Sequence, residues 1–98
     1  MGKKINIEEL DIQVVEMGNL PLIIFRGKLG YIATAQISIE SVEKLGDVAA
    51  ITPSVRNVEE FINSKLRAVT TWAEDLGLRE GMTVKRAIRV LNGEEKIY

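Results

Sequence analysis

The sequence predicts an α+β domain in two layers, with an N-terminal β-hairpin and mixed sheet packed by three to four helices. Three observations support this fold class. Strand-like apolar runs lie mainly in the first half of the 98-residue chain. Helical spacings of apolar residues, bounded by capping residues, dominate the second half. No linker or internal repeat divides the chain, so we expect a single globular domain over residues 1–98.

Strand patterns come first along the chain. Residues 5–14 mix an alternating pattern with a break, which predicts a first strand or a bulged pair. The continuous apolar run Leu20–Arg26 predicts a strand covered on both faces. Gly27–Gly30 reads as a turn in which glycine reaches positive φ, and Tyr31–Ile37 as the returning strand. These segments predict a hairpin.

The middle of the chain predicts a short helix followed by a strand. Ser38 or Glu40 begins the helix, and Gly46 ends it in the left-handed conformation. One apolar face of this helix is expected from Ile39, Val42 and Leu45. The segment 47–51 then predicts a strand that ends at Thr52-Pro53.

Three helices are predicted in the second half. Asn57 and Glu60 have the spacing of a capping box, and Phe61 and Ile62 form the buried side of the helix that follows. Residues 65–76 fit a helical face that ends at Gly77, although residues 65–71 also suit a strand, and both interpretations stay open. Thr83 caps the last helix, whose apolar face is Val84, Ala87, Ile88 and Leu91.

Composition limits the chemistry and the partners. The chain has no histidine and no cysteine, which removes the usual metal ligands, the commonest general base and the thiol nucleophile. We therefore predict no metal site and no cofactor, and the sequence leaves open whether the protein is an enzyme.

A net charge of −1 argues against nucleic acid as a partner. The apolar run Leu20–Phe25 is far shorter than the roughly 20 residues of a membrane span. The start of the chain lacks the apolar region of a signal peptide, so we expect a cytoplasmic protein with no membrane partner.

Two segments resemble a known family. Gly30-Tyr31-Ile32-Ala33-Thr34-Ala35-Gln36-Ile37 and Ala73-Glu74-Asp75-Leu76-Gly77-Leu78-Arg79-Glu80-Gly81-Met82-Thr83 are similar to the YunC-like proteins, a small bacterial and archaeal family of unknown function. The resemblance runs from about residue 20 to residue 91 and includes Val55-Arg56. It implies an α+β fold and brings no established activity or cofactor. Where members of that family often have a cysteine, this chain has Thr34.

A ligand site is expected where the strand after Gly30 meets the turn before the last helix. The candidate residues for it are Tyr31, Thr34, Arg56, Glu74, Asp75, Gly81 and Thr83. Glu74 and Asp75 would oppose the dipole at a helix C-terminus, so Arg79, Arg56 or Arg67 is expected to compensate them. One interpretation is an ion pair or hydrogen bonds that hold the turn at residues 77–81. A functional carboxylate and a simple solvated charge are the others. The segment Gly81–Thr83 is either an anion site or only a helix cap.

The sequence is compatible with two main functions. The first is a homo-oligomeric interaction or scaffold module, most simply a homodimer, with an apolar interface around residues 20–37 or on the last helix. The alternative is a small-molecule-binding protein or minimal enzyme with a carboxylate/arginine site near Tyr31, Arg56, Glu74 and Asp75. Nucleic-acid binding has only the G-x-x-G loop at residues 27–30 and the basic face of the last helix in its favour.

Overall fold

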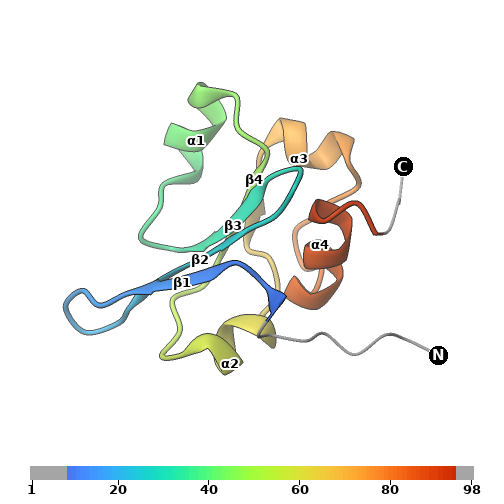
Figure 1. Cartoon of the computed structure of the whole chain (residues 1–98). Helices are drawn as coiled ribbons and strands as arrows, with labels where there is room; N and C mark the ends of the chain where they lie inside the picture. Colours follow the sequence, from blue (N-terminus) through green and yellow to red (C-terminus); the bar gives the residue numbers. More distant parts are fainter. Residues whose placement is uncertain (1–8, 95–98) are drawn as a thin grey trace.

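The computed structural model describes residues 9–94, which form a mixed five-stranded sheet and four helices (Figure 1). The elements along the chain are β1 (Ile12–Val15), β2 (Leu22–Arg26), β3 (Tyr31–Thr34), α1 (Ile39–Leu45), β4 (Ala49–Thr52), α2 (Val58–Ile62), β5 (Ala68–Val69), α3 (Thr71–Asp75) and α4 (Val84–Leu91). Most strands precede the helices, as an α+β fold requires. Ile5 and Ile7 of the predicted first strand lie outside the described residues.

The strands lie in the order β1-β2-β3-β4-β5. β1, β2 and β3 are antiparallel neighbours, which confirms the predicted hairpin. β3 and β4 are parallel, and α1 makes the crossover between them. β5 returns antiparallel to β4. The crossover places the start of α1 at the carboxyl end of β3.

The glycines in the hairpin turn serve close packing rather than an unusual backbone conformation. In the described residues the positive-φ glycines are Gly46, Gly77, Gly81 and Gly93, so the expected positive φ at Gly27 or Gly30 is wrong. A Cβ on Gly30 would lie 2.3 Å from the carbonyl oxygen of Val48. A Cβ on Gly27 would lie 3.0 Å from the Leu91 Cβ. Tertiary contacts therefore require both positions to be small.

The end residues of α1 are those that the sequence predicts. The Ser38 hydroxyl accepts a hydrogen bond from the Ser41 N–H, and Gly46 ends the helix with φ of 79°. Val42 is buried, whereas Leu45 is 73% exposed. The predicted apolar face is therefore wrong at Leu45, which lies outside the part of α1 that is buried.

The single helix predicted over residues 65–76 is wrong. Lys65 bridges to Thr83, residues 68 and 69 form β5, and only residues 71–75 are helical. The Arg67 N–H donates to the Ile51 carbonyl at 2.7 Å, and the Thr70 N–H to the Ala49 carbonyl at 2.9 Å. Pairing with β4 overrides the local helical pattern, and the alternative strand interpretation holds for part of this segment.

The main core lies between one face of the sheet and helices α2, α3 and α4. Its sheet residues include Ile23, Phe25, Ile32 and Ala50, and its helix residues include Phe61, Ile62, Ala73, Val84, Ala87, Ile88 and Leu91. The predicted apolar face of α4 is confirmed, since all four of its residues are buried. α1 packs on β4, and its Glu43 carboxylate accepts a hydrogen bond from the Thr71 N–H at the start of α3, at 2.7 Å (Figure 1). No helix in residues 9–94 is long and apolar enough to cross a membrane.

Candidate functional site

The predicted site residues do not form one cluster. Tyr31 begins β3 and Thr34 ends it, which separates them by roughly 10 Å along the strand. β4 is parallel to β3 and pairs Thr34 with Thr52, so Arg56 follows the end of the sheet that lies away from Tyr31. Thr70, which pairs with Ala49, carries α3 to the Tyr31 end. The structure therefore separates Arg56 from Tyr31 and does not assemble them into a joint site.

Tyr31 is hydrogen-bonded to an aspartate that lies 16 residues away in the sequence. Its hydroxyl donates to the Asp47 carboxylate at 2.5 Å. Burial, this hydrogen bond and the negative charge of Asp47 together raise the pKa of Tyr31 to about 12. The phenol therefore keeps its proton well above pH 10, which makes it a hydrogen-bond donor and a poor general base.

This pKa predicts a loss of stability in alkali. Between pH 10 and about 12 the unfolded chain loses the Tyr31 proton while the folded chain retains it, so the free energy of unfolding falls as the pH rises. Below pH 10 both states hold the proton and the contribution is fully present. Urea unfolding of the wild type and of Tyr31→Phe across this range tests the prediction. An equally steep loss in Tyr31→Phe would contradict it.

Thr34 is fully buried, and its hydroxyl group already has a hydrogen-bond partner within the sheet. Its hydroxyl oxygen accepts a hydrogen bond from the Ile23 N–H at 3.1 Å, with no exposed surface on the residue. The side chain thus links β3 to β2. A ligand would reach this hydroxyl only by disrupting the sheet, so its geometry is that of a structural residue.

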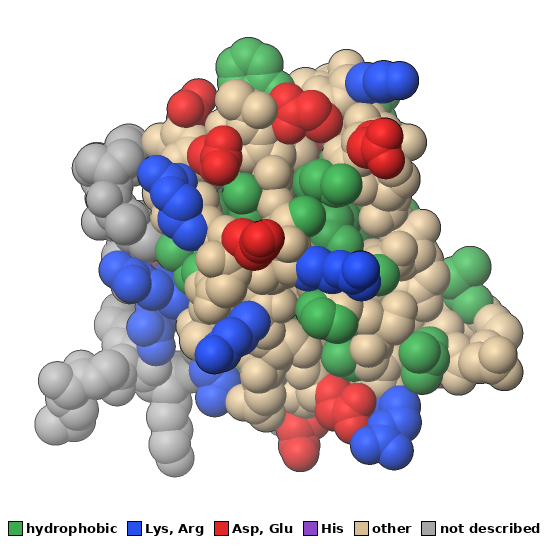
Figure 2. Space-filling model, turned by 180° about the vertical axis from the view of Figure 1, so that it is seen from behind, with side chains coloured by type: hydrophobic (Ala, Val, Ile, Leu, Met, Phe, Trp, Pro, Cys, Tyr) green, Lys and Arg blue, Asp and Glu red, His purple; other side chains and the backbone are tan. Residues whose placement is uncertain are grey.

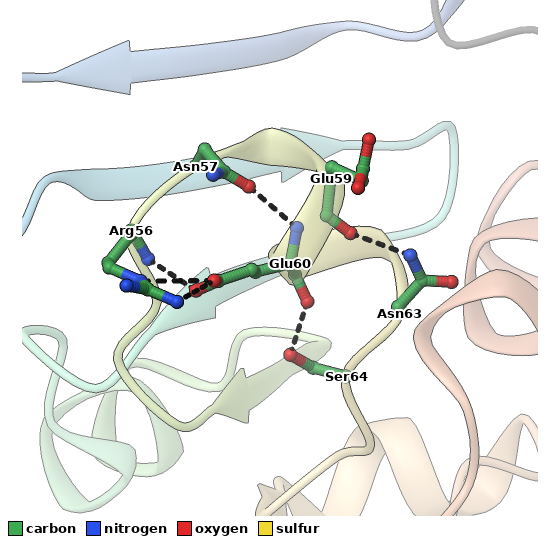
Figure 3. A network of polar contacts seen from close by, with 6 residues as sticks. All are labelled: Arg56, Asn57, Glu59, Glu60, Asn63 and Ser64. Atoms are coloured by element: carbon green, nitrogen blue, oxygen red, sulfur yellow. Dashed lines mark hydrogen bonds and ion pairs between the residues drawn. The ribbon is translucent and has the colours of Figure 1, made fainter.

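Arg56 lies against Glu60 at the start of α2 (Figure 3). The guanidinium contacts the carboxylate at 2.8 and 3.0 Å, and the Arg56 backbone N–H donates to the same group at 2.9 Å. The side-chain hydrogen bond, followed by the backbone one, lowers the pKa of Glu60. Asn57 caps the helix as predicted by accepting from the Glu60 N–H, but the return contact of the box goes to Arg56 rather than to Asn57. This exposed network orders the helix start.

Glu74 and Asp75 are exposed on α3, and no described residue forms an ion pair with their carboxylates. Arg79 instead donates to the carbonyl oxygens of Glu74 and Leu78, at 2.8 and 2.7 Å. It thereby satisfies one of the last carbonyl groups of the helix and one in the turn that follows, and the first of these is the usual role of a cation at a C-terminus. The arrangement matches the interpretation of the two acids as solvated charges.

Gly81 and Thr83 support the start of α4. The Gly81 N–H donates to the Leu66 carbonyl at 2.8 Å, and the Thr83 hydroxyl accepts from the Arg86 N–H at 3.3 Å. Both residues therefore have structural partners. Within residues 9–94 no group of three or more acidic side chains is placed to hold a metal ion.

Thr70 is a central polar residue that the sequence pattern did not single out. Its fully buried hydroxyl accepts from the N–H groups of Ala49 and Ala73, at 3.1 and 3.2 Å, and donates to the Asp47 carbonyl at 2.8 Å. One side chain thus connects β4, the loop before it and the start of α3. The sequence pattern missed this role because Thr70 falls inside the helix expected over residues 65–76, and not at an expected N-cap.

Clefts in the described part of the molecule include one beside α1 and one beside the β1–β2 pair. The first, of about 350 Å³, is lined by Ala35, Ile37, Ser38, Ile39, Glu40, Ile51, Arg67 and Ala68. The second, of about 400 Å³, is lined by Glu9, Leu10, Asp11, Phe25, Arg26, Gly27, Lys28, Asn92 and Glu94. Arg26 in the second cleft is paired with Asp11 at 3.0 Å. The first cleft brings together residues that the sequence did not group into a site.

Comparisons with known proteins concern the fold and the family. A crystal structure of a protein of unknown function from Thermoplasma acidophilum superposes with a TM-score of 0.71 at 22% identity, covering 84% of this chain and 92% of that one. At this identity the likeness shows the fold alone. No curated protein matches. Residues 35–91 match the family described as Domain of unknown function (DUF1805). Because this match spans more than half of the 98 residues, the chain belongs to the DUF1805 family.

Proposed function

We propose that the protein is a homo-oligomeric interaction module, most simply a homodimer, which assembles through the outer edge of β1. The observation that carries the proposal is an apolar edge strand whose outer side has no partner among the described strands. β1 lies at one end of the sheet, and no described strand pairs with its outer side. Val14, Val15 and Met17 are 44, 46 and 56% exposed there. An exposed apolar edge is a template for pairing with another chain.

The register supports pairing through the backbone of Val14. The Arg26 N–H donates to the Asp11 carbonyl, and Ile12 stands opposite Phe25. Hydrogen-bonded pairs alternate in an antiparallel ladder, so the N–H and C=O of Val14 point away from β2. A second copy related by a two-fold axis would satisfy them with its own β1.

The side chains near this edge favour the same assembly. Val14 and Val15 are adjacent in a strand and therefore lie on opposite faces of the sheet. In the view from behind, hydrophobic side chains lie on the flank formed by the β1–β2 hairpin (Figure 2). The last helix, one of the two interfaces expected from the sequence, buries its apolar face in the core instead. The other, around residues 20–37, contains the interior strands β2 and β3, so the β1 edge proposed here lies outside both.

The oligomeric state tests the proposal. Sedimentation equilibrium over a range of concentrations is expected to show a dimer for the wild type. Val14→Lys introduces a charge at the centre of the edge and is expected to weaken association at least tenfold. Leu45→Lys is the matched control, because Leu45 is 73% exposed but belongs to α1. Thermal unfolding of each variant verifies that it is folded.

Two outcomes would overturn this assignment. A wild-type protein that stays monomeric at tens of micromolar would remove the oligomer altogether. Dissociation by Leu45→Lys, with Val14→Lys still dimeric, would move the interface from β1 to the corner formed by α1 and α3. Trp72, which is 49% exposed and close to Gly46, would then belong to that interface.

We also propose a family relationship and a cellular location for this protein. We infer that the chain is related to the YunC-like proteins through the segments Gly30–Ile37 and Ala73–Thr83. We also propose that it acts in the cytoplasm, a reducing compartment with which a chain without cysteine is compatible. The alternative function, small-molecule binding, is not favoured at Tyr31 and Arg56, which lie at opposite ends of the sheet.

A further inference from the structure

A cleft of about 350 Å³ lies where the chain leaves β3 and enters α1. Ile51 and Ala68, which face each other across β4 and β5, lie on its sheet side. Ile37 and Ile39 line it from the connection between β3 and α1. Ligands of open sheets bind at the carboxyl ends of parallel strands, and this cleft has that position beside the parallel pair β3 and β4. Its size is in the range of small-molecule sites.

Arg67 gives this cleft an available cation. Its backbone is held by the 2.7 Å hydrogen bond to the Ile51 carbonyl, while its side chain has no hydrogen bond or ion pair with any described residue. Other arginines are engaged: Arg26 by Asp11, Arg56 by Glu60, and Arg79 by helix carbonyls. An unoccupied guanidinium on a fixed backbone is suited to two parallel hydrogen bonds with a carboxylate.

We propose that this cleft binds a small aliphatic carboxylate. Arg67 would receive the carboxylate, and the isoleucine side chains would cover the hydrocarbon part. Ser38 also lines the cleft; its hydroxyl oxygen accepts from the Ser41 N–H, so the hydroxyl hydrogen is left to donate to the ligand. This inference is independent of the assembly proposed for β1.

Glu40 narrows the class of ligand. Its carboxylate lines the same cleft, yet it forms no ion pair with Arg67 among the described contacts. A second negative charge on the ligand would therefore be repelled, which disfavours phosphate esters and dicarboxylates. An amine on the ligand would be attracted. The shared chemistry is a monocarboxylate with an aliphatic chain, supplied either as a simple acid or as an aliphatic amino acid.

Amide chemical-shift perturbation by NMR tests the site with four probes. Isovalerate carries both the carboxylate and the branched chain, and is expected to shift the amides of residues 35–40, 67 and 68. Isoamylamine lacks the carboxylate and inorganic phosphate lacks the chain, so neither is expected to bind there. Leucine adds an amine: tighter binding than isovalerate, lost in Glu40→Gln, would identify the amino acid as the better ligand. Equal or weaker binding of leucine would identify the simple acid.

Three variants separate the proposed contact from a general charge effect. Arg67→Gln is expected to raise the Kd of isovalerate tenfold or more, since it removes both charge-assisted hydrogen bonds. Arg26→Gln, at the other cleft, is expected to change this Kd by less than twofold. Glu40→Gln is expected to lower the Kd by relieving repulsion. Binding of isovalerate that Arg67→Gln leaves unchanged would overturn the proposal, and so would equal binding of isoamylamine or no shift at these residues in the wild type.

Discussion

Gly30→Ala is expected to destabilise the fold by about 3 kcal/mol, the upper part of the usual range for overpacking. The new Cβ would lie 2.3 Å from the Val48 carbonyl oxygen and 2.6 Å from its Cγ1. The same carbonyl accepts the Tyr31 N–H at 3.1 Å, so β3 cannot move away without losing a hydrogen bond at its first residue. In a domain of this size the change lowers the unfolding midpoint by roughly 10–20 °C. Thermal and urea unfolding measure it.

Gly18→Ala is the matched control. Nothing lies within 4 Å of a Cβ on Gly18, and its φ is not positive. The substitution is expected to change the free energy of unfolding by less than about 1 kcal/mol, in either direction. Equal stabilities of the two alanine variants would show that the close approach of Gly30 to Val48 is absent in solution.

Thr70→Val is expected to cost about 2–4 kcal/mol. Valine has nearly the shape of threonine but cannot accept from the N–H groups of Ala49 and Ala73 or donate to Asp47. The loss combines an N-cap, worth about 1 kcal/mol, with buried groups left unsatisfied, at about 1–3 kcal/mol. Urea unfolding gives the free energy, and amide exchange at Ala49 and Ala73 is expected to accelerate.

Two substitutions control for other effects at this residue. Thr70→Ser keeps the hydroxyl and loses one methyl group, for which roughly 1 kcal/mol is expected. Thr83→Val removes the exposed N-cap of α4, whose hydroxyl accepts from the Arg86 N–H, and is also expected to cost about 1 kcal/mol. If Thr70→Val were no more destabilising than these two, the buried hydroxyl would not have the central role described.

Local signals account for the elements that sequence reasoning found. Ser38, Asn57 and Thr83 cap their helices through contacts three residues ahead, and Gly46 ends α1 just after its last turn. Each contact depends on a few neighbouring residues, so spacing alone reveals it. The β2–β3 hairpin is predictable for the same reason, since its strands are joined by a short turn.

Contacts between distant residues account for the misses. Residues 65–76 have a helical pattern, but pairing of Arg67 and Thr70 with β4 divides the segment. Such pairings depend on where the rest of the chain lies, and no periodicity contains that information.

The ligand site predicted from the sequence differs from the cleft in the structure for the same reason. The family-like segments predict one site that contains Tyr31, Arg56 and Glu74. The sheet instead places Tyr31 and Arg56 at opposite ends. From the sequence, Arg67 is predicted only as a possible counterion for Glu74 and Asp75. It becomes a candidate binding residue because β5 pairs with β4 and brings it into the cleft with residues 35–40.

The sequence by itself determined the fold class, the N-caps of α1, α2 and α4, the hairpin and the buried face of α4, because each follows from residues close together in the chain. Only the tertiary structure decided that Gly30 is needed for its contact with Val48, and that Thr70 joins three segments. It also decided that Arg67 lines a cleft and that no described strand pairs with the outer side of β1. These properties arise from the order and register of strands distant in the sequence, which only the folded chain specifies.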